Sequence, residues 1–195
     1  MHEVFERIDS LIQSKDLVMV AIDGNSGAGK SNLASIIEKE YECNVFHMDD
    51  YFLRPEQRTI YRLREVGGNI DYERFKQEVI DGILSRKRFS YSKYDCKTKT
   101  LDVSIAVEPK KLNIIEGVYS LHPTLSEFYD LKIFLTIDKK EQIRRLSNRE
   151  DPSKLKRFIE EWIPLEDEYF KELEIKKKCD LVLDGTLHPQ PSSNK

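Results

Sequence analysis

The sequence predicts an α/β fold in which a mostly parallel, five-stranded sheet lies between two layers of helices, a three-layer α/β/α arrangement. Three observations support this prediction. Short apolar runs alternate with segments of helical periodicity along most of the chain. One of these runs leads into a glycine-rich turn that opens a helix. The chain has 195 residues, 39% of them hydrophobic, which is enough for one α/β core.

The first predicted unit is a helix, a buried strand, a loop and a second helix. Residues 2–14 place apolar side chains at helical spacing, and residues 17–22 form a continuous apolar run. Helical spacing returns in residues 30–41, after the glycine-rich loop. A short second strand over residues 44–47 leads to two adjacent aspartates. The charged stretch that follows contains a Gly-Gly-Asn turn and predicts a loop or a broken helix.

The middle of the chain continues the alternation of strands and helices. Residues 71–86 have the apolar stripe of an amphipathic helix. The segment of about 88–107 alternates apolar and polar residues, which predicts a small two-stranded β arm. The apolar runs 112–115 and 131–137 predict two further strands, with a short helix around 123–129 between them.

The last third of the chain predicts charged helices and one final strand. Helices are expected over about 139–150 and 152–173, and a strand over 180–184. Part of the helical region, about 139–157, is the segment that we expect to form a lid. We therefore predict one domain over residues 1–188, followed by a polar tail over residues 189–195 that is rich in Pro and Ser.

Composition excludes several classes of partner. The 32 basic and 35 acidic side chains are interspersed and leave a net charge of -3, so a nucleic acid is not an expected partner. No apolar run approaches the roughly 18 residues of a membrane span, and no signal peptide is evident. We expect a soluble, cytoplasmic protein without a membrane partner. Cys43, Cys96 and Cys179 lack CxxC spacing, so we expect reduced thiols rather than disulfides or a zinc site.

The most specific motif is Gly24-Asn25-Ser26-Gly27-Ala28-Gly29-Lys30-Ser31, which fits GxxxxGK followed by Ser or Thr. Its glycines let the backbone wrap a polyphosphate, so that N–H groups and the positive end of the next helix face the anionic oxygens. Lys30 is expected to contact the β and γ phosphates, and the Ser31 hydroxyl to bind Mg²⁺. The motif therefore predicts a P-loop NTPase fold with ATP and Mg²⁺ as cofactors. The predicted ATP-binding residues are Gly24 to Ser31 and the adjacent Asn32.

Two acidic positions beyond this motif, Asp49 and Glu116, each follow a predicted strand. Glu116 ends the apolar run 112–115, where a carboxylate can hold the metal or a metal-bound water. A kinase also needs a carboxylate that accepts the proton of an alcohol, and Asp49 is the candidate, with a second role as a metal ligand. Adjacent side chains diverge, so only one of Asp49 and Asp50 is expected to be chemical. Strand-end carboxylates that merely cap turns are the alternative interpretation.

Arginines in the predicted lid complete the expected catalytic set. Arg145 and Arg149 are four residues apart and share one helix face, where they could neutralise charge on the transferring phosphoryl group. The alternative is a solvated helix face whose arginines pair with Glu141, Glu150 or Asp151. With Lys30, Arg145 and Arg149 placed around the phosphates, Asp49 would act as the base.

Several segments, in this order, resemble the uridine kinase and phosphoribulokinase family of P-loop small-molecule kinases: GNSGAGKS, HMDDYF, NIDYERF, YSKYDCKT, IIEGVYSL, and the stretch from DLKIFLTID to EDEYF. The resemblance implies that Asp49 is the catalytic base and Glu116 the acidic strand end. It also implies that Asp71 binds ribose hydroxyls and that Tyr94 lines a base pocket. Asp71 is equally suited to cap the first turn of a helix.

The chain also departs from uridine kinases. Those enzymes place a base-reading histidine a few residues beyond the tyrosine, where this chain has Lys97, Thr98 and Lys99. One of two adjacent lid arginines is replaced by Leu146, and Glu150 stands in place of an aspartate.

The sequence as a whole predicts an ATP-dependent small-molecule kinase that phosphorylates an alcohol group of a nucleoside or a similar metabolite. Its expected partners are a nucleoside triphosphate and a small-molecule acceptor, and a homo-oligomer is compatible with the sequence. The alternative is a non-kinase P-loop ATPase, or a nucleotide-dependent switch, that acts with a protein partner. Dependence of ATP consumption on an acceptor separates the two interpretations.

Overall fold

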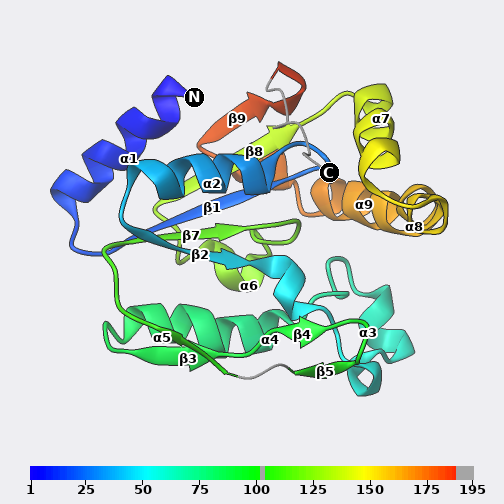
Figure 1. Cartoon of the computed structure of the whole chain (residues 1–195), viewed down its shortest axis with the longest axis horizontal. Helices are drawn as coiled ribbons and strands as arrows, with labels where there is room; N and C mark the ends of the chain where they lie inside the picture. The colour runs from blue at the N-terminus through cyan, green and yellow to red at the C-terminus, as the bar shows by residue number, and fades with distance from the viewer. Residues whose placement is uncertain (102–103, 188–195) are drawn as a thin grey trace.

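The computed structural model describes residues 1–101 and 104–187, and a five-stranded sheet forms its centre (Figure 1). The strand order is β2-β7-β1-β8-β9, and every neighbouring pair is parallel. The strands are β1 (Val18–Gly24), β2 (Cys43–His47), β7 (Leu112–Glu116), β8 (Leu131–Thr136) and β9 (Leu181–Asp184). The predicted three-layer α/β/α fold with a five-stranded parallel sheet is therefore confirmed.

Apolar runs form the central strands because both faces of the sheet are covered. Every residue of β1 and of β7 is buried. On one face, β1 packs against α1 (His2–Ser14) and α2 (Lys30–Glu40), whose side chains Val4, Ile8, Leu33 and Ile37 join the same core. The N-terminal helix and the helix after the glycine-rich loop were both predicted.

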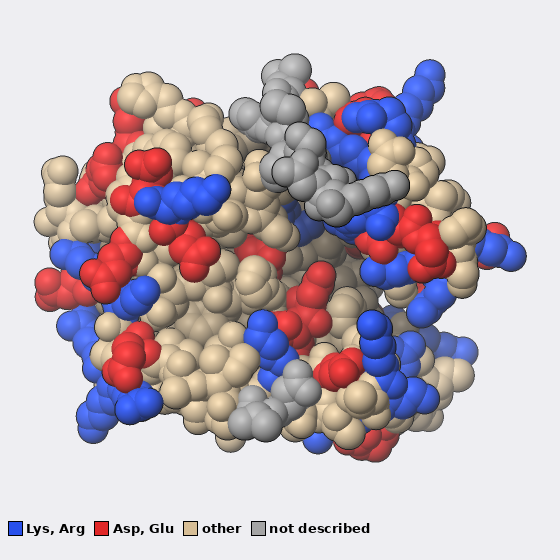
Figure 2. All heavy atoms as spheres, viewed as in Figure 1, with Lys and Arg blue, Asp and Glu red and all other residues tan. Residues whose placement is uncertain are grey.

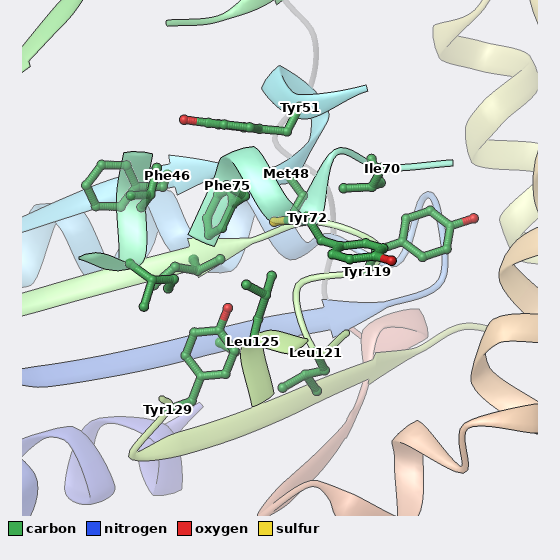
Figure 3. Close-up of a cluster of buried hydrophobic side chains, with 14 of the residues drawn as sticks. Phe46, Met48, Tyr51, Ile70, Tyr72, Phe75, Tyr119, Leu121, Leu125 and Tyr129 are labelled. Atoms are coloured by element: carbon green, nitrogen blue, oxygen red, sulfur yellow. The ribbon is translucent and has the colours of Figure 1, made fainter. Parts of the chain in front are cut away.

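The other face carries a second core that includes many aromatic side chains (Figure 3). It packs against one helical segment made of α4 (Tyr72–Phe75), a π-helical turn over Lys76–Ile80 and α5 (Asp81–Leu84), as predicted for residues 71–86. The short helix α6 (Pro123–Ser126) contributes the buried Leu125. The sheet thus lies between two helical layers, and its carboxyl edge is left for loops.

The predicted β arm consists of two short antiparallel ladders below the main sheet in Figure 1. One ladder pairs β3 (Phe89–Tyr91) with β6 (Ile105–Val107). The other pairs β4 (Tyr94–Asp95) with β5 (Thr100–Leu101). The buried Tyr91 and Val107 attach the base of the arm to the aromatic core.

The predicted charged helices form a lobe beside the carboxyl edge of the sheet (Figure 1). They are α7 (Lys139–Arg149), α8 (Pro152–Arg157), a π-helical turn over Phe158–Trp162 and α9 (Ile163–Glu172). Asp138 and Asp151 cap α7 and α8, because each side chain accepts hydrogen bonds from two backbone N–H groups of the following turn. A small core of Leu146, Phe158 and Ile163 holds the lobe together.

Short helical turns make up the remaining connections. The stretch after β2 contains the 3-10 turns Met48–Tyr51 and Pro55–Gln57 and the helix α3 (Ile60–Arg64), in agreement with the predicted broken helix. Two more 3-10 turns, Ile175–Lys178 and Gly185–Leu187, flank β9. Within the described residues, no helix combines the length and the apolar character that crossing a bilayer requires. The predicted polar tail lies outside the described residues.

Candidate functional site

The glycine-rich loop joins the end of β1 to the start of α2. Gly24, the last residue of β1, has a φ of 133°, and a Cβ added there would lie 2.1 Å from the carbonyl oxygen of Leu135 in β8. Only glycine allows both this backbone conformation and this approach of the two strands. The loop therefore leaves the sheet at a position that a side chain would block.

A buried aspartate anchors the base of the loop. One oxygen of Asp23 accepts a hydrogen bond from the Gly24 N–H at 2.7 Å. The other accepts from the Leu121 N–H at 3.0 Å and from the Tyr169 hydroxyl at 2.9 Å. Burial raises the pKa of Asp23 to about 6, against these hydrogen bonds and Lys30, which lower it. Asp23 therefore connects the loop to the segment after β7 and to α9. Nothing in the local sequence marks Asp23, because an acidic residue beside a glycine-rich turn is ordinary.

Two side chains of the helical lobe hold Ser26 in the middle of the loop. The Glu166 carboxylate accepts hydrogen bonds from the Ser26 N–H at 3.0 Å and from its hydroxyl at 2.5 Å. Gln142 Nε2 donates to the Ser26 carbonyl oxygen at 2.9 Å. Both Glu166 and Gln142 are buried, and burial raises the pKa of Glu166, whereas Lys30 lowers it. The loop is thus fixed by α7 and α9, through residues that sequence reasoning did not single out.

Lys30 and Ser31 begin α2 and face the carboxyl edge of the sheet. The Lys30 ammonium donates to the carbonyl oxygens of Gly24, at 2.8 Å, and Asn25, at 3.1 Å. The Ser31 hydroxyl donates to Glu116 Oε1 at 3.1 Å, so two of the three predicted metal ligands are in direct contact, the third being Asp49. A hydroxyl and a carboxylate are oxygen ligands of the kind that Mg²⁺ prefers.

His47 is a further residue of this edge that the sequence analysis did not identify. It lies opposite Glu116 in the register of β2 and β7, and its Nδ1 is 2.5 Å from Glu116 Oε1. The hydrogen bond to Glu116 raises the pKa of His47. In the described parts of the chain, no group of three or more His, Cys, Asp or Glu side chains could form a metal cage. Mg²⁺ at the predicted ligands Ser31, Glu116 and Asp49 would therefore take water and phosphate oxygens for the rest of its shell.

Asp49 lies in the turn after β2, at the same edge. Gly117, with a φ of 136°, allows this turn to approach the end of β7, since a Cβ there would lie 2.8 Å from Met48 Cβ. Solvent reaches Asp49, but the protein atoms around it desolvate the carboxylate and raise its pKa. Lys30 lowers that pKa and Glu116 raises it, so all three charges are close enough to interact. Asp50 points elsewhere and pairs with Lys93 of the arm at 3.0 Å.

The two lid arginines have different surroundings. Arg145 is largely buried, and its guanidinium donates to Glu141 Oε1 at 2.7 Å, to the Gly27 carbonyl oxygen at 3.2 Å and to the Gly185 carbonyl oxygen at 3.0 Å. It therefore lies against the phosphate loop. Arg149 is 57% exposed and donates to Glu150 at 2.6 Å. Figure 2 shows a hollow in the surface between the lobe that carries these helices and the region of α3.

Asp71 is buried, with both carboxylate oxygens in contact with protein groups. Oδ1 accepts from the Arg74 N–H at 3.2 Å, so Asp71 caps α4. Oδ2 accepts from Gln57 Nε2 at 2.8 Å and is 3.4 Å from Arg74 Nε. Tyr94 lies in β4 of the arm and is 8% exposed. Asp71 therefore lies at the start of α4 and caps that helix.

Comparisons with known proteins agree with the motifs. No family model matches the chain. A segment of 122 residues, 62% of the chain, is 26% identical to the uridine-cytidine kinase C of Dictyostelium discoideum, and the chain spans only 27% of that protein's length. A structure described as a possible uridine kinase from Bacillus stearothermophilus superposes with a TM-score of 0.64 and 23% identity. That superposition covers 93% of this chain and 100% of the other. The resemblance to uridine kinase-like P-loop kinases is therefore confirmed, and the fold is theirs.

Proposed function

We propose that the chain is an ATP- and Mg²⁺-dependent kinase that transfers the γ-phosphoryl group to an alcohol group of a nucleoside or a similar metabolite. One observation carries the proposal: four predicted residues meet at the carboxyl ends of three neighbouring strands. Lys30 and Ser31 follow β1, Glu116 ends β7, and Asp49 follows β2. The similarity to a uridine-cytidine kinase supports the nucleoside part.

This arrangement separates the tasks of phosphoryl transfer among different groups. Lys30 supplies positive charge beside the loop, where the phosphate oxygens would lie. Ser31 and Glu116 would hold Mg²⁺, which offsets negative charge on the phosphate oxygens when it is bound. Asp49, on the next strand, is free of protein ion pairs among the described residues and would accept the proton of the attacking hydroxyl.

The lid arginines would have unequal roles. Arg145 already touches the loop through the Gly27 carbonyl oxygen, so we infer that it holds the loop and the bound phosphates. Arg149 would have to leave Glu150 before it could reach the phosphates.

Asp71 and Tyr94 are proposed to bind the acceptor. Asp71 is only 2% exposed and Gln57 donates to its Oδ2, so an acceptor hydroxyl would have to move Gln57 aside to reach the carboxylate. The exchange replaces one hydrogen bond to a carboxylate by another, so its net cost is small. Lys97 and Lys99, which stand where uridine kinases have a base-reading histidine, would favour acceptors other than uridine.

The test is ATP consumption by the purified chain with Mg²⁺ and a panel of nucleosides, pantothenate, glycerate and phosphorylated sugars, with mass spectrometry of the products. We expect one compound to accelerate ATP consumption and to gain one phosphoryl group. Lys30→Ala serves as the inactive control. Equal ATP hydrolysis with and without every acceptor would contradict the proposal and favour an ATPase or switch that acts on a protein partner.

A further inference from the structure

A second hollow lies at the amino edge of the sheet, opposite the phosphate loop. It has a volume of about 160 Å³ and lies between the starts of β2 and β7, the end of α5 and the base of the arm. Asn44 and Asn113, the second residues of β2 and β7, line it. All strands run in parallel, so these residues are at the other end of the strands from Asp49 and Glu116. The cavity is therefore separate from the proposed kinase site.

The wall of this cavity is strongly basic. Arg86, Lys87, Lys110 and Lys111 line it, with Asp16 as the one carboxylate. The chain as a whole carries a net charge of -3, so this concentration of cations is local.

Most of these cations lack a protein counterion. Over residues 1–101 and 104–187, no ion pair involves Arg86, Lys87 or Lys111. Lys110 donates to the Cys43 carbonyl oxygen at 3.0 Å, which leaves its charge unneutralised. Cations that converge on a concave surface raise the local positive potential and attract an anion.

The cavity lining combines a hydrogen-bonded pair of asparagines with apolar side chains. Asn113 is only 1% exposed. Its Oδ1 accepts from Asn44 Nδ2 at 3.1 Å, and its Nδ2 donates to the Lys110 carbonyl oxygen at 3.0 Å. The lining also includes the apolar side chains of Leu17, Ile83 and Phe89. A ligand with an anionic group and a compact apolar body would match both parts of the lining.

We propose that this cavity binds a small organic phosphate, whose phosphate group faces Arg86, Lys87 and Lys111 and whose apolar body contacts Phe89. The phosphate class is favoured over a simple carboxylate because three cations without protein counterions surround the site, and a phosphate offers more charge and more acceptor oxygens. The volume corresponds to about five water molecules at roughly 30 Å³ each, which suits a compact ligand. The inference holds whether or not the chain is a kinase.

The experiment is a titration of phenyl phosphate into the full chain labelled with ¹⁵N. The protein is first saturated with Mg²⁺ and a non-hydrolysable ATP analogue, so that the phosphate loop is occupied. The side-chain amide signals of Asn44 and Asn113 report directly on the cavity lining. We expect saturable shifts of these signals, and weaker binding of inorganic phosphate, which lacks the apolar body.

A charge-matched pair of variants makes the test specific. The double variant Lys87→Ala and Lys111→Ala is expected to weaken phenyl phosphate binding at least tenfold. The control, Lys176→Ala with Lys178→Ala, removes the same charge from exposed positions that do not line the cavity. Equal weakening in both variants would reduce the effect to net charge, and absence of saturable shifts would overturn the site. Equal affinity for inorganic phosphate would overturn the assignment to an organic ligand.

Discussion

The phosphate loop and the acceptor side of the cleft are held in place differently. The loop is fixed by buried groups: Asp23 binds its base, and Glu166 and Gln142 bind Ser26. On the acceptor side, Asp71 is bound by Gln57, which is itself part of a short turn. The loop is therefore held by buried groups, whereas Asp71, on the proposed acceptor side, would first have to exchange a hydrogen bond.

The two regions also differ in how far their apolar side chains are exposed to solvent. Next to the acceptor side, α3 exposes Ile60 at 60% and Tyr61 at 84%. The loop residue Ala28 is 1% exposed. Regions with few buried apolar contacts open at a lower free-energy cost than the core. We therefore expect the loop to be preorganised and the proposed acceptor side to open more easily.

The largest expected effects concern the shared catalytic edge. Lys30→Ala and Asp49→Asn should each lower turnover by about 10³-fold or more, since one removes phosphate charge neutralisation and the other the base. Only Lys30→Ala should also weaken binding of an ATP analogue, measured by calorimetry. Asp50→Asn is the matched control, because Asp50 pairs with Lys93 instead. Near-normal turnover of Asp49→Asn would show that the base is another group.

The second prediction tests how firmly the loop is anchored. The pKa of Asp23 is about 6 in the folded chain and its usual value is 3.8, so the folded state holds the proton more tightly. The resulting stability is present below about pH 4 and is lost as the pH rises through about 6. Relative to Asp23→Asn, the wild type should therefore lose up to about 3 kcal/mol of unfolding free energy between pH 4 and 7.

Urea unfolding of both proteins at several pH values measures this difference, and other titrating groups cancel in the comparison. Tyr169→Phe removes one hydrogen bond to Asp23 and should steepen the pH dependence slightly, since that bond lowers the pKa. A stability difference that does not change with pH would mean that the pKa of Asp23 is the same in the folded and unfolded states.

The third prediction addresses the acceptor side. Once an acceptor is identified, Asp71→Asn should raise its KM about tenfold to a hundredfold and leave the KM for ATP unchanged, since a hydrogen bond to a charged group contributes about 1.5–3 kcal/mol. Asn keeps the ability to cap α4, so folding should be little affected. Gln57→Ala should lower the acceptor KM, because Asp71 Oδ2 no longer needs to exchange partners. If neither variant alters acceptor KM, Asp71 serves only the helix and Arg74.

The smallest expected effect compares the two arginines of α7. Arg145→Ala should raise the KM for ATP about tenfold, because the loop loses a guanidinium that contacts the Gly27 carbonyl oxygen. Arg149→Ala should change it less than threefold, since an exposed ion pair with Glu150 contributes about 0–1 kcal/mol. Steady-state kinetics of the two variants measure these changes in the KM for ATP. Equal losses in kcat would indicate that Arg149 reaches the phosphates in a closed state.

Local patterns in the sequence were sufficient to predict the sheet, the helices and part of the candidate site. The strands follow from apolar runs, and Lys30 and Ser31 follow from a loop whose geometry depends on its own glycines. Glu116 and Asp49 could be placed because the ends of parallel strands meet at one edge. These inferences need no knowledge of how distant segments pack.

The remaining contacts of the candidate site depend on packing between segments that are distant in the sequence. Glu166 binds Ser26 across 140 positions in the chain, and Tyr169 binds Asp23 across 146, so no spacing in the sequence relates them. Arg145 and Arg149 share one helical face in the sequence, yet only the first contacts the loop. Local sequence patterns were enough to identify Lys30, Ser31, Asp49 and Glu116 as residues with the chemistry for phosphoryl transfer. The tertiary structure alone decided which of them are in contact, because burial and long-range hydrogen bonds depend on the position of every layer of the fold.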